Sequence, residues 1–151
     1  MITYAKEKWV DIVDDCIPLF QRHWEEIALN KDKVKLAINF EAYQKLCDAD
    51  ILKAYTARDG EKIVGYHIFL VTPHLHYMND LFAVADVLFV APEYRGKMAG
   101  LKLIKFSEQQ LKADGVAVIV QNTKLAHDFG PILERLGYSQ SERIFTKYTG
   151  D

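Results

Sequence analysis

The stretch that decides the fold covers residues 87–100 and reads Val87-Leu88-Phe89-Val90-Ala91-Pro92-Glu93-Tyr94-Arg95-Gly96-Lys97-Met98-Ala99-Gly100. An apolar strand leads here into the start of a helix, whose unpaired N–H groups and partial positive charge favour an anion. Gly96 lets the backbone approach a ligand closely, and Arg95 and Lys97 add positive charge. We therefore expect a phosphate site, with an ordinary strand-to-helix turn bearing surface cations as the alternative.

Helical patterns dominate the N-terminal third. Apolar residues recur at helical spacing over residues 9–27, where Pro18 removes a backbone donor and predicts a kink or two helices. Asn39 is a suitable N-cap for a second, short helix that carries Phe40 and Tyr43 on one face.

Strand patterns follow. Residues 51–57 and 63–71 are rich in β-branched and aromatic side chains, and Asp59-Gly60 between them predicts a hairpin with positive φ at both central positions. Residues 83–90 form a third strand, which is apolar on both faces apart from Asp86 and so is expected near the centre of a covered sheet.

The C-terminal half alternates between the two patterns. We expect a helix from residue 101 to Gly115, a strand at 116–120, a helix at 129–136 and a last strand at 144–148. With a short first strand at residues 2–4, this order predicts an α/β layer structure with a partly antiparallel sheet. No linker or repeat divides the chain, so residues 1–151 are interpreted as a single domain.

Composition excludes several functional classes. The net charge is −2 with both signs mixed along the 151 residues, which argues against nucleic acid as a partner. Cys16 and Cys47 are the only cysteines and form no Cys-x-x-Cys pair, so neither a disulfide framework nor a zinc site is expected. The N-terminus lacks a signal-peptide pattern and no apolar run reaches membrane-spanning length, which favours a cytoplasmic protein without a membrane partner.

The order Val90-x-Pro92-x-Tyr94-Arg95-Gly96-Lys97, followed by Gly100 and an apolar helix, resembles the acetyl-CoA signature of the GNAT superfamily, Arg/Gln-x-x-Gly-x-Gly/Ala. Residues 133–138 resemble that family's late helix and Gly-Phe strand start. The resemblance implies a single-domain α/β fold, a mixed sheet flanked by helices whose central parallel strands, here 83–90 and 116–120, splay apart. Residues 74–77 and 142–147 also resemble a GNAT subgroup found in phage and bacterial genomes.

The resemblance implies N-acetyltransferase activity, with acetyl-CoA donating to a primary amine on a small molecule, peptide or protein. The pantetheine arm would lie between the splayed strands and the pyrophosphate on the loop. The cofactor-binding residues so implied are Leu88, Phe89, Val90, Arg95, Gly96, Lys97, Met98, Ala99, Gly100 and Asn122. A non-catalytic CoA-binding module and a phage-encoded interaction or inhibitor protein on the same fold are the alternatives. A homodimer that pairs through the final strand is one option for the oligomeric state.

Two positions depart from the family pattern. Met98 replaces the first signature glycine, and we expect a regular helical residue there, without positive φ. Leu133 occupies the position of the family's general-acid tyrosine, so that role is unassigned, with Tyr138, Tyr148 and His127 as candidates by proximity in sequence.

Asp86 is the main catalytic candidate. A carboxylate alone in an apolar strand needs a partner or a function, and many GNAT enzymes place there an acid that handles the substrate amine. The alternative is an aspartate held by backbone N–H groups. His76 and Tyr77 are the further catalytic candidates and are expected in the substrate pocket, with a structural hydrogen bond as the alternative. His74 and His76 could both point to one side of an extended segment, but no third metal ligand lies beside them, so no metal site is expected.

Overall fold

The computed structural model describes residues 1–150 and contains a five-stranded sheet in the order β1-β2-β3-β4-β5. Neighbouring strands are antiparallel except β4 and β5, which are parallel, so the sheet is mixed as predicted. The strands are β1 (Ile2–Glu7), β2 (Leu52–Asp59), β3 (Lys62–His74), β4 (Tyr77–Val90) and β5 (Val116–Val120).

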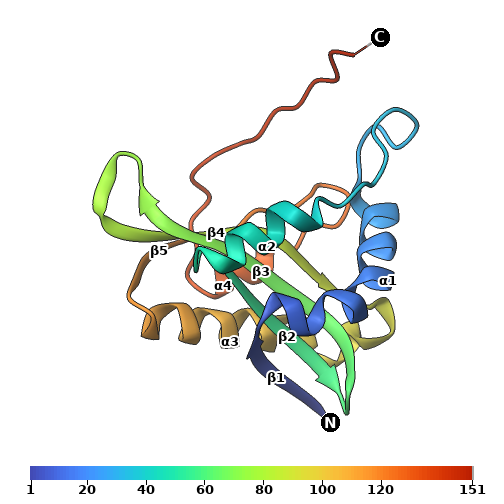
Figure 1. The fold of residues 1–151 in the computed structure, drawn as a ribbon, viewed down its shortest axis with the longest axis horizontal. Coiled ribbons are helices and arrows are strands. Elements are labelled where there is room, and N and C mark those ends of the chain that lie inside the picture. The colour runs from blue at the N-terminus through green and yellow to red at the C-terminus, as the bar shows by residue number, and fades with distance from the viewer. Residues whose placement is uncertain (151) are drawn as a thin grey trace.

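Helices cover both faces of this sheet (Figure 1). Residues on α1 and α2 pack with one buried cluster, and residues on α3 pack with the other. Strand β2 supplies Leu52 and Ala54 to the first cluster and Tyr55 and Ala57 to the second, because neighbouring strand residues point to opposite faces. The helices are α1 (Trp9–Ile27), α2 (Phe40–Asp48), α3 (Ala99–Ala113) and α4 (Gly130–Arg135).

The predicted helices form with small corrections. The first is one element that continues through Pro18, and Figure 1 shows its ribbon changing direction along its length, as a proline kink requires. The N-cap of α2 is confirmed, because the Asn39 side chain accepts a hydrogen bond from the backbone N–H of Ala42 at 2.9 Å. Gly115 and Gly137, with φ of 85° and 95°, follow α3 and α4 as expected of helix ends.

The β2–β3 hairpin is confirmed, with its turn shifted by one residue. Asp59 still pairs with Lys62, so the two turn residues are Gly60 and Glu61. Only Gly60 has a positive φ, 62°, which corrects the expectation of two such positions. Strand β4 also begins earlier than predicted, at Tyr77, because it continues the β3–β4 hairpin.

The two parallel strands splay apart. Their pairing ends at Val84 and Val120, although β4 continues to Val90. Just beyond that point the Asn122 side chain donates a hydrogen bond to the Ala85 carbonyl at 3.1 Å, where a strand backbone would otherwise bond. The splay implied by the family resemblance is therefore present.

The predicted last strand, residues 144–148, does not form. Residues 138–150 contain no strand, and Figure 1 shows this segment running away from the sheet to the C-terminus. Ile144 is 74% exposed and Phe145 is 86% exposed. Alternation of side chains marks a segment that can be a strand, but a strand also needs a neighbour for its backbone groups.

Two histidines are buried in the protein interior. His67 has 0% exposure, and its ring nitrogens lie 3.1 Å from Ser107 Oγ and 3.1 Å from Gln121 Oε1. His23 Nδ1 lies 2.9 Å from the Tyr66 hydroxyl. Burial lowers the pKa of His67 to about 3 and that of His23 to about 4, because the charged imidazolium loses its hydration.

We expect the free energy of unfolding to fall as the pH drops below the ordinary histidine value of 6.5. The unfolded chain then binds protons that the folded chain excludes, at up to about 1.4 kcal/mol per pH unit for each histidine until its folded pKa is reached. Urea unfolding at several pH values between 7 and 4 measures this slope. His67→Gln should make the slope shallower, whereas the exposed His76→Gln should leave it unchanged. Equal slopes in all three proteins would contradict the expectation.

Candidate functional site

A cavity of about 600 Å³ opens where β4 and β5 separate. Most of the predicted cofactor residues line it: Leu88, Phe89, Val90, Arg95, Gly96, Met98, Gly100 and Asn122. Lys97 and Ala99 do not. The Lys97 ammonium lies 5.9 Å from the ring centroid of Tyr94, and Ala99 is buried in the core cluster beneath α3.

The signature segment is a short helix followed by a sharp turn. Residues Pro92–Lys97 form a 3₁₀ helix, η1, with proline at its start, where the missing N–H carries no penalty. Met98 has φ 60° and ψ 14°, and α3 begins at Ala99. The expected regular helical conformation at Met98 is therefore wrong. Because the turn from η1 into α3 needs a left-handed residue, the family's glycine at this position has a conformational reason.

Gly96 faces open space. A Cβ added at Gly96 would meet no atom within 4 Å, and one at Gly100 would lie 3.8 Å from Val90 Cγ2. Neither position is filled by neighbouring protein, so the backbone of the segment borders the cavity directly. The first N–H groups of α3 have no partner within the helix, which makes this border suited to an anion.

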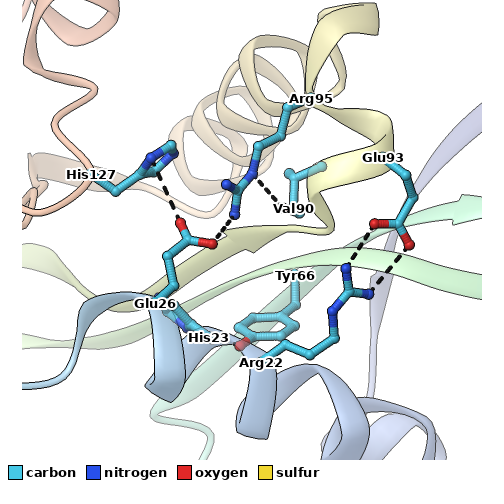
Figure 2. A network of polar contacts seen from close by, with 8 residues as sticks. All are labelled: Arg22, His23, Glu26, Tyr66, Val90, Glu93, Arg95 and His127. Atoms are coloured by element: carbon cyan, nitrogen blue, oxygen red, sulfur yellow. Dashed lines mark hydrogen bonds and ion pairs between the residues drawn. The ribbon is translucent and has the colours of Figure 1, made fainter.

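Arg95 is bound to the protein on two sides (Figure 2). Its Nε donates to the Val90 carbonyl at 2.8 Å, and its Nη2 donates to Glu26 Oε2 of α1 at 2.7 Å. The other Glu26 oxygen lies 3.6 Å from His127 Nδ1. The Arg95 charge, predicted to attract phosphate, is thus balanced by Glu26.

A second ion pair joins the same two elements. Arg22 of α1 donates to both carboxylate oxygens of Glu93 in η1, at 3.3 Å and 2.7 Å (Figure 2). These hydrogen bonds lower the pKa of Glu93 to about 2. Helix α1 therefore holds η1 and the end of β4 in place by two arginine–carboxylate contacts.

Asp86 lies at the edge of the cavity and is exposed, which corrects the expectation of a buried carboxylate. Its partner is a side chain, because the Tyr43 hydroxyl of α2 donates a hydrogen bond to Asp86 Oδ2. Burial and this contact with the carboxylate raise the pKa of Tyr43, so the phenol keeps its proton. The backbone hydrogen bonds offered as the alternative are not the contacts observed.

His76 and Tyr77 lie at the turn between β3 and β4, far along β4 from Asp86. The His76 N–H donates to His74 Nδ1 at 3.0 Å, and the Tyr77 ring stacks on Phe82 at a centroid distance of 5.9 Å. Neither lines the cavity that Asp86 borders, so the structure does not bring these two residues together with Asp86. Within residues 1–150 no three potential ligands are grouped to hold a metal ion, and no helix is long and apolar enough to cross a membrane.

The candidates for the general acid are dispersed. Leu133 is 7% exposed and buried in α4. The Tyr138 hydroxyl accepts a hydrogen bond from Gln121 Nε2 at 3.4 Å, and the centroid of the Tyr148 ring lies 4.9 Å from Lys33 Nζ. Of the three candidates only His127 lines the 600 Å³ cavity.

A second cavity of about 280 Å³ adjoins the first and shares His23, Ile27, Val87 and Lys124 with it. Its walls come from α1, α2 and the sheet, and its other lining residues are Phe20, Trp24, Ala28, Leu36, Ile38, Tyr43 and Tyr66. His23 was not singled out from the sequence. It lies three residues after Phe20 and four before Ile27, and this helical spacing is the signal that it points inward.

The sequence model of the Acetyltransferase (GNAT) family matches residues 11–129. The chain belongs to this family. A relative, the aminoalkylphosphonate N-acetyltransferase of Salmonella typhimurium, is 28% identical over 129 residues, which are 80% of each chain.

Two solved structures show that the GNAT fold extends over the whole chain. The ribosomal-protein-alanine N-acetyltransferase of Brucella melitensis biovar Abortus 2308 superposes with a TM-score of 0.80 at 18% identity and covers 100% of this chain and 99% of its own. A predicted acetyltransferase with acetyl-CoA from Clostridium acetobutylicum gives a TM-score of 0.72 at 12% identity, covering 98% and 96%.

Replacing Met98 by glycine should stabilise this GNAT protein. The left-handed conformation costs a residue with a side chain about 1–2 kcal/mol, and glycine avoids this cost. Because glycine has more conformational freedom in the unfolded chain, about half of the gain in stability is lost again. We expect a rise in the melting temperature of about 2 °C. Met78→Gly is the matched control, because Met78 is also exposed but lies in β4, where glycine should lower the melting temperature. A lower melting temperature for Met98→Gly would show that its side chain supports the turn by packing.

Proposed function

We propose that the protein is an N-acetyltransferase that transfers an acetyl group from acetyl-CoA to a primary amine. The observation that carries this proposal is the junction of two cavities at Val87, one between the splayed strands and one beneath α1 and α2. An acyl donor and an acceptor can therefore approach each other from different sides. The activities named for the Salmonella and Brucella relatives are of this reaction type.

The residues around the larger cavity fit acetyl-CoA, which supplies an acetyl thioester when bound. Beyond Val84 the edge of β4 that faces β5 has no strand neighbour. Apart from the Ala85 and Val90 carbonyls, which Asn122 and Arg95 bind, its backbone is available to an extended arm with amide groups. The border formed by Gly96 and Gly100 is open and is followed by the N-terminus of α3, which suits a pyrophosphate.

Asp86 is the residue we assign to the acceptor amine. An alkylammonium has an ordinary pKa of about 10.4 and must lose its proton before its nitrogen can attack a carbonyl carbon. The Asp86 carboxylate lies on the cavity wall one residue before Val87, where it can hold the ammonium and accept its proton, directly or through a water. Tyr43 fixes one of its oxygens by a hydrogen bond and leaves the other free for the amine.

Gly96→Asp should weaken acetyl-CoA binding at least tenfold, which is about 1.4 kcal/mol. The new carboxylate enters open space at Gly96, so it repels phosphate without distorting the fold. Gln109→Asp is the control, since Gln109 is exposed on α3, away from both cavities, and adds the same charge. Calorimetric titration measures both affinities. Unchanged affinity in folded Gly96→Asp would exclude this segment as the cofactor site.

Asp86→Asn should lower acetyl transfer at least about 100-fold while acetyl-CoA affinity stays unchanged, because the amide cannot accept the proton. It should also remove the acidic limb of the pH–rate profile where chemistry limits the rate. Tyr43→Phe is informative beside it, because it removes the hydrogen bond but leaves the carboxylate. Single-turnover assays and thermal melts on the same samples test this. A lower melting temperature with normal turnover per folded molecule would assign Asp86 a structural role.

The finer expectations stay predictions from the sequence: the likeness to a phage and bacterial subgroup, the cytoplasmic location and the homodimer. The comparisons offer no support for the alternative of a non-catalytic or inhibitory protein. Turnover of labelled acetyl-CoA with a panel of amines decides between catalysis and mere binding.

A further inference from the structure

The smaller cavity has walls that suit an apolar group. Phe20, Trp24 and Tyr66 contribute aromatic rings, and Ile27 and Val87 contribute aliphatic surface. His23 is neutral at pH 7, because burial lowers its pKa to about 4, so it adds no charge to these walls. A ligand body with many hydroxyl or ammonium groups would leave them without partners here.

Lys124 is the cation at the boundary of the two cavities. Within the part of the chain that the structure describes, it forms no ion pair. By contrast, the neighbouring cation Arg95 is already balanced by Glu26. Lys124 can therefore meet an anionic group on a ligand without breaking a contact in the protein.

Opposite charge lies at the same junction. Asp86 borders the larger cavity, and its hydrogen-bond partner Tyr43 lines the smaller one. A ligand bound at Val87 therefore lies near the Asp86 carboxylate, which suits an ammonium group, and near the Lys124 side chain, which suits an anion. The other walls of the smaller cavity are apolar.

We propose that the smaller cavity binds the acceptor, and that the acceptor is a small zwitterionic amine with an apolar body, whose acidic group pairs with Lys124. This inference rests on the proposed N-acetyltransferase function and names the substrate class of the same site. A carboxylate and a phosphonate share the required chemistry. A polycationic acceptor fits poorly, since it would bring further ammonium groups against Lys124.

Four amines that share one apolar body form a matched panel. Phenylalanine carries a carboxylate, 1-amino-2-phenylethylphosphonate carries a phosphonate, and phenylalaninamide and phenethylamine carry no anion. We expect kcat/KM at least fivefold higher for the two compounds that carry an acidic group than for the two that carry only the amine. Lys124→Met should remove this preference, lowering kcat/KM for the two compounds with an acidic group much more than for phenethylamine. Lys105→Met is the control, because Lys105 is exposed on α3 and lines neither cavity.

Binding of the same compounds gives a readout that does not depend on turnover. Trp24 lines the smaller cavity, whereas the other tryptophan, Trp9, is buried at 2% exposure, so ligand binding should change the Trp24 fluorescence. Titrations with and without CoA should show tighter binding of phenylalanine than of phenethylamine, and Lys124→Met should equalise the two.

The two proposals fail in different ways. Acetylation of these amines without any preference for an acidic group, or a preference that Lys124→Met does not reduce, overturns the zwitterion inference and leaves the acetyltransferase function intact. Charge-dependent binding at Trp24 with no acetyl transfer to any amine contradicts the acetyltransferase function. Equal binding of the compounds with and without an acidic group in the unaltered protein overturns the inference whatever the turnover.

Discussion

The site depends on one constraint, which is that the backbone pairing between β4 and β5 stops at Val84 and Val120. A parallel pair that continued would satisfy the carbonyl and N–H groups of β4 and close the sheet at this point. Instead, two of the carbonyls are bonded by side chains, Ala85 by Asn122 and Val90 by Arg95. The strands can separate because these contacts replace part of the lost ladder. The cavity between the two strands is therefore part of the sheet's architecture, and the backbone of β4 forms one of its walls.

Helix α1 keeps that opening in shape. One face of the helix packs on the sheet through residues such as Trp9, Ile12 and Phe20. Its polar positions Arg22 and Glu26, one helical turn apart, contact Glu93 and Arg95 of η1. Arg95, the arginine of the family signature, thus links α1 to the end of β4, because its guanidinium donates hydrogen bonds to Glu26 and to the Val90 carbonyl (Figure 2). The proposed anion site then consists of the backbone at Gly96 and the start of α3, where no side chain caps the helix.

The chemical asymmetry of the two cavities suits a transfer reaction. The larger one has an open backbone edge and charged rims, and the smaller one is apolar with Lys124 at its boundary. They meet where Asp86, held by Tyr43, borders Val87. A donor with amides and phosphates would therefore bind in the larger cavity, and an acceptor with an apolar body in the smaller one. Their reacting groups would then lie close to the Asp86 carboxylate at the junction.

The sequence by itself determined the element order as far as α4, the capped helix α2, the β2–β3 hairpin, the signature segment at residues 90–100 and, through its resemblance, the splay. These features depend on local periodicity, turn chemistry and caps, which neighbouring residues carry. Tertiary structure alone decided that Met98 is left-handed, that Asp86 is exposed and bonded to Tyr43, that Glu26 neutralises Arg95 and that His76 and Tyr77 lie apart from the site. It also decided that residues 144–148 have no strand neighbour and that His23 and Lys124 border both cavities. Each of these outcomes depends on where distant elements pack against one another, and that geometry has no counterpart in the spacing of residues along the chain.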